Sequence, residues 1–299
     1  MILPEPLIPV FLKATKAGEE FISEAAAHRR VREGTLRPAP YGPPRGLRND
    51  VGITVARTAA GWPAYTLRPR NPGARGHLIY AHGGGWVNEI SPQHWQLAAQ
   101  IAAEARTTVH VLIYPLVPFG TAGRVVDGFT TEVLKCLESA EPTVLAGDSA
   151  GGQIVLSTLL HLRDRHQVTL PRTIAIAPAV DLSMKNPEIA AVQPSDPWLG
   201  TRGTQVFIDL WRDALDVDDP TVSPLNGDLE GLGPVTLFSG TRDILNPDGR
   251  LFAQRAARAG VDVEYVEKQG QLHVYPLLPT ATGRAARQHI VARVREATA

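Results

Sequence analysis

Residues 144–152 constrain the fold of this chain more than any other stretch. They read Val-Leu-Ala-Gly-Asp-Ser-Ala-Gly-Gly, and residues 153–160 continue without Pro or Gly, so an apolar strand, a tight turn and a helix are expected in succession. The spacing Gly-x-Ser-x-Gly in that setting is typical of a nucleophile elbow, a strained turn that lifts a serine hydroxyl above the edge of a sheet. Gly147 and Gly151 suit the turn because a Cβ at either position would collide with the neighbouring strand or helix. The stretch therefore predicts Ser149 as a nucleophile.

A glycine block lies upstream of this elbow. The run His82-Gly-Gly-Gly directly follows the apolar residues 78–81. When a serine attacks a carbonyl, negative charge develops on the carbonyl oxygen, and rigid backbone N–H groups that already point at it stabilise that charge. Consecutive glycines allow the main chain to approach a substrate closely. We expect the amides of Gly83, Gly84 and Ala150 to form such an oxyanion hole; a flexible glycine turn is the alternative for this block taken alone.

Together, the His82-Gly-Gly-Gly block and the run Gly147-Asp-Ser-Ala-Gly-Gly resemble the hormone-sensitive-lipase-like branch of the α/β-hydrolases, the bacterial esterases with HGGG and GDSAGG motifs. The similarity runs from about Gly76 to the C-terminus. This resemblance implies an α/β-hydrolase fold, with a mostly parallel central sheet, helices on both faces and a helical lid. It also implies serine carboxylester hydrolysis without a metal or an organic cofactor.

The pattern of strands agrees with this fold class. Apolar strand cores alternate with helix-like segments, which favours a mostly parallel sheet that is covered on both faces. The expected strand cores are residues 78–81, 109–114, 144–146, 174–177, 235–238 and 261–266. Residues 51–55 and 64–67 alternate in polarity like half-exposed strands and are expected to form an antiparallel edge. In such sheets reactive groups collect at the carboxyl ends of the strands, where both motifs lie.

The chain is expected to divide into four parts. Residues 1–46 form N-terminal helices and a Pro/Gly-rich connector, and the resemblance implies that they are part of a lid. Residues 47–180 form the first part of the catalytic core, 181–219 the lid insertion, and 220–299 the second part of the core. Aromatic residues of the glycine block and the insertion are candidates for the wall of the substrate pocket, or simply pack the lid on the core: Trp86, Trp198, Phe207 and Trp211.

A serine needs a base, and an imidazole that titrates near neutrality suits that role. In α/β-hydrolases the order along the chain is serine, acid, histidine. Of nine histidines, His273 is the one beyond the elbow that lies in a loop (residues 268–275) after a predicted strand. Asp243 follows the strand at 235–239 and is the expected acid, as family members have an aspartate in the matching loop. Asp248 is the runner-up, although it better suits a helix start, where a carboxylate complements the helix dipole.

The composition of the chain limits which partners, cellular compartment and metal sites are expected. The 30 basic and 30 acidic residues balance, which disfavours nucleic acid or an anionic membrane as a partner. The single cysteine, Cys136, excludes an internal disulfide, fits a reducing compartment and is expected to be a packing residue. No Cys/His cluster has the spacing of a zinc site, so no metal is expected. We find neither a signal peptide pattern nor an apolar run of about 18 residues, so a cytoplasmic enzyme without an integral membrane segment is expected.

The predicted reaction starts with attack of Ser149 on an ester carbonyl. His273 takes and returns the proton, Asp243 orients the imidazole, and water releases the acid from an acyl-enzyme. The expected partner is a small-molecule ester with a short or medium acyl chain, and a homodimer is left open. A lactonase, an amidase or a deacetylase, including the steryl-acetate type, would use the same triad. A non-catalytic member of the fold that binds a small ligand is the less favoured alternative.

Two departures from the family pattern concern the substrate. The common segment Tyr-Arg-Leu-Ala-Pro-Glu is replaced by Tyr114-Pro-Leu-Val-Pro-Phe, and the glycine often found four places after the glycine triplet is Glu89. Both changes are expected near the alcohol side of the site. The resemblance therefore does not fix the substrate preference.

Overall fold

The computed structural model describes residues 2–71 and 73–299, in which a single sheet of eight strands has the order β1-β2-β4-β3-β5-β6-β7-β8. The strands are β1 (Val51–Arg57), β2 (Pro63–Pro69), β3 (His77–Ala81), β4 (Thr108–Leu112), β5 (Thr143–Asp148), β6 (Thr173–Ile176), β7 (Val235–Arg242) and β8 (Val263–Leu272). β2 pairs antiparallel with β1 and with β4, and the other neighbours are parallel. The predicted mostly parallel sheet with an antiparallel edge is confirmed.

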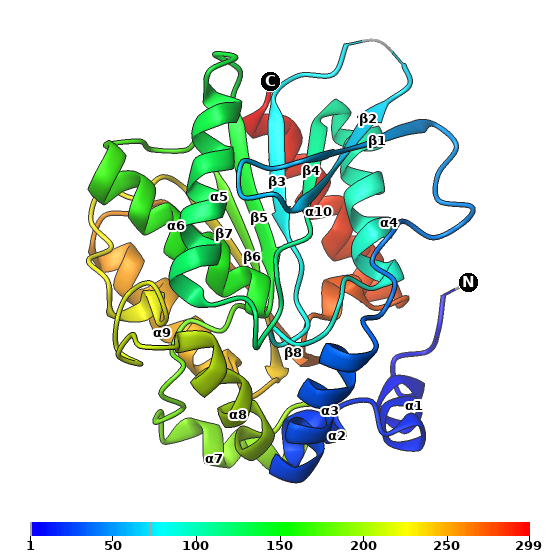
Figure 1. Ribbon diagram of the computed structural model, residues 1–299, viewed down its shortest axis with the longest axis vertical. Helices are drawn as coiled ribbons and strands as arrows, with labels where there is room; N and C mark the ends of the chain where they lie inside the picture. The colour runs from blue at the N-terminus through cyan, green and yellow to red at the C-terminus, as the bar shows by residue number, and fades with distance from the viewer. Residues whose placement is uncertain (1, 72) are drawn as a thin grey trace.

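Helices cover both faces of this sheet (Figure 1). The helices are α1 (Leu7–Thr15), α2 (Glu19–Ile22), α3 (Glu24–Leu36), α4 (Pro92–Ile101), α5 (Ala122–Leu137), α6 (Ala150–His166), α7 (Glu188–Val192), α8 (Thr201–Arg212), α9 (Asn246–Arg258) and α10 (Ala281–Ala297). One core packs α5, α6 and α9 against the sheet, and a second core packs α4 and α10 against its other face. The strands between them are buried on both sides, as their continuous apolar runs predict.

The last strand differs from its prediction. β8 begins at Val263 and continues to Leu272, so most of the segment expected as a loop at 268–275 is strand. Residues 266–268 still pair with β7, and after a register shift Arg242 pairs with Leu272. His273 therefore follows directly on a paired strand rather than sitting in a free loop, and its backbone is held in place.

The two segments expected to form a lid lie together at the carboxyl ends of the parallel strands (Figure 1). α2 packs on α8, where the Phe21 and Phe207 rings meet edge to face with centroids 5.7 Å apart. Gly203 allows this approach, because a Cβ there would lie 2.2 Å from the carbonyl oxygen of Glu20. The four-part division stays a prediction, and Met1 and Pro72 of the first two parts lie outside the described residues. None of the helices in the described ranges combines the length and apolar character needed to cross a bilayer.

Candidate active site

Ser149 lies in the tight turn between β5 and α6. Its backbone has φ 54° and ψ −119°, a strained conformation for a residue with a side chain. The glycines on either side are required by close backbone approaches. A Cβ on Gly147 would lie 2.3 Å from the carbonyl oxygen of Gly151, and a Cβ on Gly151 would lie 2.1 Å from that of Ala81. The turn thus has the geometry that the sequence motif predicts.

Three side chains from separate parts of the sequence form one hydrogen-bonded chain. The Nε2 atom of His273 lies 2.9 Å from Oγ of Ser149, and Nδ1 lies 2.8 Å from Oδ2 of Asp243. With the proton on Nδ1, His273 donates to Asp243 and accepts from the serine hydroxyl, which is the tautomer a general base needs. His273 and Asp243 are buried. Burial lowers the pKa of His273, but the charge and hydrogen bond of Asp243 outweigh it, and the net pKa is raised.

The structure also separates the two candidate acids. Asp243 receives a second hydrogen bond, from the amide of Leu245 at 2.9 Å, which fixes the carboxylate toward the imidazole. Asp248 lies in the first turn of α9, and its Oδ1 accepts from the Asn186 side chain at 2.7 Å. It therefore has the helix-start position that its sequence context favours, and it makes no hydrogen bond to His273.

Asp196 is a nearby residue that the sequence reasoning missed. Its buried carboxylate accepts backbone N–H groups of Trp198 (2.8 Å) and Leu199 (2.9 Å) on one oxygen, and of Ile244 (3.0 Å) on the other. Burial, and next the charge of Asp243, raise the pKa of Asp196 to about 6. The side chain ties segment 181–219 to the loop that carries Asp243. Its only signal in the sequence is an Asp-Pro-Trp run in an irregular segment.

One predicted oxyanion donor is wrong. The amide of Gly83 already donates to Oδ1 of Asp148 at 3.1 Å, and Gly83 does not line the cavity beside Ser149. Gly84, Gly85 and Ala150 do line it. Of the glycine block, Gly84 and Gly85 are thus the residues that lie at the cavity beside Ser149.

Asp148 bridges the glycine block and the elbow. Its buried carboxylate accepts from the Tyr80 hydroxyl at 2.6 Å and from Gly83, and it pairs with Nε2 of His94 at 3.1 Å. Burial raises the pKa of Asp148, but the interactions with His94 and Tyr80 outweigh it and the net pKa is lowered. These partners lie more than 50 positions upstream, so they could not be read from the local sequence.

Replacing Gly83 by alanine is expected to lower kcat by about 100- to 1,000-fold, as much as the loss of one oxyanion donor, because it displaces the amides of Gly84 and Gly85 from Ser149. The added Cβ would lie 2.2 Å from Oδ2 of Asp148, so the glycine block must move away from the elbow. Steady-state kinetics on a p-nitrophenyl ester measure the effect. Gly123→Ala is the matched control, because its Cβ meets only Cδ1 of Leu215 at 3.9 Å. A Gly83→Ala enzyme with the wild-type kcat would contradict the bridging role of Asp148.

A cavity of about 540 Å³ opens at Ser149 and His273. Its walls are mostly apolar and come from the N-terminal helices and from segment 181–219. The former contribute Ile8, Phe11, Leu12 and Phe21, and the latter contributes Met184, Trp198 and Leu199. Two residues predicted for the substrate pocket line this cavity: Trp86, and Trp198, whose ring lies edge-on to His273 with centroids 5.9 Å apart.

The other two predicted pocket residues, Phe207 and Trp211, do not line the cavity. Both are fully buried on α8. Phe207 packs against Phe21, and Trp211 stacks on Trp86 with ring centroids 5.5 Å apart. The Trp211 indole also donates to Oε1 of Gln153 at 3.0 Å, which satisfies its polar atom in the core. They support the wall from behind rather than forming it.

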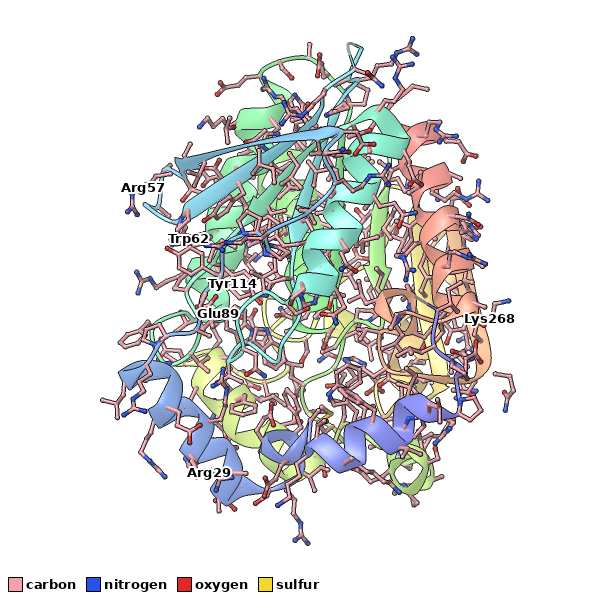
Figure 2. The ribbon with its side chains drawn as sticks, turned by 90° about the vertical axis from the view of Figure 1, so that its right-hand side faces the viewer. Arg29, Arg57, Trp62, Glu89, Tyr114 and Lys268 are labelled. Carbon is pink, nitrogen blue, oxygen red and sulfur yellow. The ribbon has the colours of Figure 1, made fainter. Side chains whose placement is uncertain are left out.

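Glu89 is the unusual polar group of this cavity. The side chain is half-buried, and its Oε2 atom is buried without a hydrogen-bond partner among the described residues. Burial raises the pKa of Glu89 to about 6, although the charge of Arg30 acts in the opposite direction. Figure 2 shows Glu89 near Tyr114, between the sheet and the N-terminal helices. A carboxyl group in this position can be neutral or charged near neutral pH.

Comparisons with known proteins agree with this geometry. Residues 78–277 match a family model described as the alpha/beta hydrolase fold. An acetyl-hydrolase of Streptomyces hygroscopicus is 28% identical over 253 residues, 82% of this chain and 82% of that protein. An esterase of Acinetobacter venetianus is 27% identical over 219 residues, 68% of this chain and 72% of its own length.

A similar solved structure is that of an esterase from the bacterial hormone-sensitive lipase (HSL) family. It superposes with a TM-score of 0.83 at 24% identity and covers 100% of both chains, a likeness of fold. The family match spans more than half of this chain. It includes the glycine block, the elbow, and both Asp243 and His273. The resemblance predicted from the two motifs is thereby confirmed, and the chain belongs to the α/β-hydrolase fold family.

Proposed function

We propose that the protein is a serine carboxylester hydrolase that acts on short- to medium-chain acyl esters through an acyl-enzyme. The observation that carries this proposal is the Asp243–His273–Ser149 hydrogen-bonded chain, with its hydroxyl end at an apolar cavity. The names of the relatives, acetyl-hydrolase and esterase, support the same class of reaction.

The geometry supports two half-reactions. In the first, Oγ of Ser149 attacks the ester carbonyl carbon while its proton passes to Nε2 of His273. The resulting oxyanion accepts hydrogen bonds from the amides of Gly84, Gly85 and Ala150. When the tetrahedral intermediate collapses, the C–O bond to the alcohol breaks and His273 protonates the departing oxygen. Throughout, the carboxylate of Asp243 accepts a hydrogen bond from the Nδ1–H group of His273.

The second half-reaction repeats the first with water. His273 removes a proton from a water molecule that attacks the acyl carbonyl, and a second oxyanion forms in the same place. The bond to Oγ then breaks, Ser149 recovers its proton from His273, and the carboxylic acid leaves. No atom or electron beyond ester and water is needed.

Acetyl-ester hydrolysis is a second candidate within this class. It is favoured by the name of the Streptomyces relative. Lactone and amide cleavage would use the same residues, and only rates on a panel of substrates distinguish them. The non-catalytic alternative is less favoured, because the base and the acid that such a binding protein does not need are present and hydrogen-bonded.

Covalent labelling tests the proposal. A fluorophosphonate should add one adduct to the wild-type protein at Ser149, measured by intact mass and peptide mapping, and none to Ser149→Ala. Rates on p-nitrophenyl acetate, butyrate and octanoate, on a lactone and on an anilide then define the substrate class. Folded wild-type protein that neither reacts with the probe nor turns over any ester would overturn the proposal. The cytoplasmic location, the homodimer and the lack of a cofactor stay predictions of the sequence.

Glu89 is expected to make the preference for a cationic alcohol depend on pH. Its pKa of about 6 means that it is neutral at pH 5 and charged at pH 7. The ratio of kcat/KM for acetylcholine to that for uncharged 3,3-dimethylbutyl acetate should rise about five-fold between these pH values, equivalent to about 1 kcal/mol for a partly screened ion pair. Titration of His273 affects both esters and cancels in the ratio. Glu89→Gln should give a flat ratio, and a flat ratio in the wild-type enzyme would contradict the expectation.

A further inference from the structure

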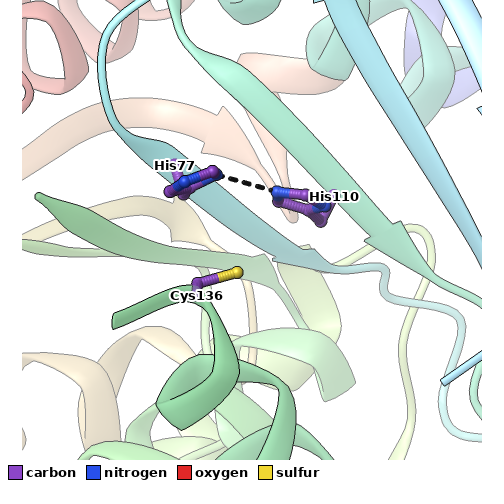
Figure 3. Close-up of side chains that lie close together, drawn as sticks. All are labelled: His77, His110 and Cys136. Atoms are coloured by element: carbon purple, nitrogen blue, oxygen red, sulfur yellow. Dashed lines mark hydrogen bonds between the residues drawn. The ribbon is translucent and has the colours of Figure 1, made fainter. Parts of the chain in front are cut away.

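A second cluster of reactive side chains lies at the other end of the sheet. His77 begins β3, His110 lies in β4, and Cys136 is close to the end of α5. Figure 3 shows both imidazole rings on the side of the sheet that faces α5, with the sulfur of Cys136 directed toward the space between them. One ring nitrogen of each histidine and the Sγ atom all lie within 4.8 Å of one another. In the described part of the chain, no other group of His, Cys, Asp and Glu side chains meets this spacing.

The two facing nitrogens share a hydrogen bond, and their separation is close to that of two ligands of one metal ion. Nδ1 of His77 lies 3.0 Å from Nε2 of His110. In a tetrahedral site with bonds of about 2.0–2.1 Å to nitrogen and 2.3 Å to sulfur, neighbouring ligand atoms are about 3.3–3.6 Å apart. For a metal ion to bind between these rings, the two nitrogens must therefore move slightly further apart, and the sulfur must move about 1 Å closer to them.

The outer nitrogen of each ring already has a polar partner, and that of His77 is a carboxylate, the kind of partner that metal-bound histidines use. Nε2 of His77 lies 3.2 Å from a carboxylate oxygen of Glu141 and 3.2 Å from the Ser139 hydroxyl. Nδ1 of His110 lies 3.3 Å from the Thr66 hydroxyl. Histidine ligands almost always donate their other N–H group to a carboxylate, a carbonyl or water, which fixes the tautomer and the ring orientation. The inner nitrogens are hydrogen-bonded to each other, so a metal ion that binds both takes the place of the proton they share, and the outer partners hold the rings in position.

The surroundings favour neutral imidazoles and a balanced charge. Burial, and next the neighbouring His77, lower the pKa of His110 to about 4, and burial lowers the pKa of His77. Around the cluster, Arg68 and Lys135 are offset by Glu132 and Glu141. Burial raises the pKa of the Cys136 thiol to about 11, so a bound metal must displace its proton.

We propose that His77, His110 and Cys136 form a zinc site that joins β3, β4 and α5, with a water molecule as the fourth ligand. Two imidazoles and one thiolate suit Zn²⁺ better than Mg²⁺ or Ca²⁺, which prefer oxygen. The site is separate from the one at Ser149, because His77 is separated from the glycine block by the length of β3, about 13 Å at 3.3 Å per residue. This inference does not depend on the proposed esterase activity.

Metal binding by the purified, tag-free protein tests the proposal. After removal of metal with a chelator, wild-type protein at pH 8 should bind one Zn²⁺ per chain in a competition titration with a chromophoric chelator. Co²⁺ should give a sulfur-to-cobalt charge-transfer band, which only a thiolate ligand produces. Zn²⁺ should raise the midpoint of thermal unfolding and leave kcat/KM for an ester unchanged. Mg²⁺ should not bind to the His77, His110 and Cys136 cluster.

Variants locate the site. Cys136→Ala should abolish the charge-transfer band and weaken zinc binding by more than 100-fold, and His110→Gln should weaken binding similarly; circular dichroism verifies that each variant is folded. Glu141→Gln, at an exposed residue, should weaken binding about 10- to 100-fold by loss of an outer partner. His166→Gln is the control and should bind like wild type, because this exposed histidine lies outside the cluster. Wild-type protein without a saturable zinc site, or equal binding by Cys136→Ala, would overturn the proposal and leave a packed histidine pair.

Discussion

Ser149→Ala is expected to abolish ester hydrolysis, with a loss in kcat of about a million-fold, as in comparable serine enzymes. The substitution removes the one atom that forms the acyl-enzyme, while the Cβ and the backbone turn are kept. His273, Asp243 and the backbone donors remain, so residual rates reflect only binding and the polarised environment. The assay is turnover of p-nitrophenyl butyrate, with active sites counted by the burst of p-nitrophenol in wild type.

Its control is another serine outside the site. Ser195 is exposed, and its hydroxyl bonds only to the carbonyl oxygen of Val192 among the described residues. Ser195→Ala should keep the wild-type rate. Circular dichroism and the thermal midpoint should show that Ser149→Ala is folded. Activity above about 1% of wild type in that variant, far more than the residual rate of enzymes that lose their nucleophile, would show that another residue attacks the ester.

Asp243→Asn has the second largest expected effect, a loss in kcat of about 10,000-fold. In the wild-type protein the carboxylate accepts a hydrogen bond from the Nδ1–H group of His273, with nitrogen and oxygen 2.8 Å apart. An amide can turn its NH₂ group to this nitrogen, which moves the ring proton to Nε2 and leaves no lone pair to receive the proton of Ser149. KM should change little, because the side chain is buried behind the imidazole. Steady-state kinetics across pH 6 to 9 measure both parameters.

Asp248→Asn is the matched control for this prediction. Asp248 is also a buried aspartate, but its partner is Asn186 and not His273. The variant should keep kcat within a few-fold of wild type. If Asp248→Asn lost activity while Asp243→Asn kept it, the assignment of the acid would be reversed.

Asp196→Asn helps to distinguish the effect of the charge at residue 196 from the effect of its hydrogen bonds. An amide at 196 still accepts from the N–H groups of Trp198 and Leu199, but it presents a donor to the amide of Ile244.

The parts of the site that the sequence predicts well are those fixed by short-range geometry or by the order of elements. The elbow is such a part, because a turn this tight demands glycine at two defined positions around Ser149. His273 and Asp243 follow from the order of strands together with the serine, acid, histidine order of the family that the two motifs resemble, since each lies just beyond a strand whose carboxyl end faces the same edge. Both statements need no knowledge of side-chain packing.

The errors come from contacts between residues far apart in the sequence. Gly83 and Gly85 are equivalent in the sequence, and the carboxylate of Asp148 decides between them from 65 positions away. Phe207 and Trp211 are as aromatic as Trp198, but the helix face of α8 turns them into the core. The His77, His110 and Cys136 cluster has no linear signature, since its two histidines are 33 positions apart and only strand pairing brings them together.

The strained backbone at Ser149 means that directed evolution for heat resistance alone can select inactive variants. A residue with a side chain at φ 54° and ψ −119° costs about 1–3 kcal/mol relative to a relaxed conformation, and glycine escapes most of that cost. Ser149→Gly should therefore melt at a higher temperature than the parent while making no product. A screen for heat resistance alone would enrich such inactive clones, so selection for robustness here has to be paired with a turnover assay.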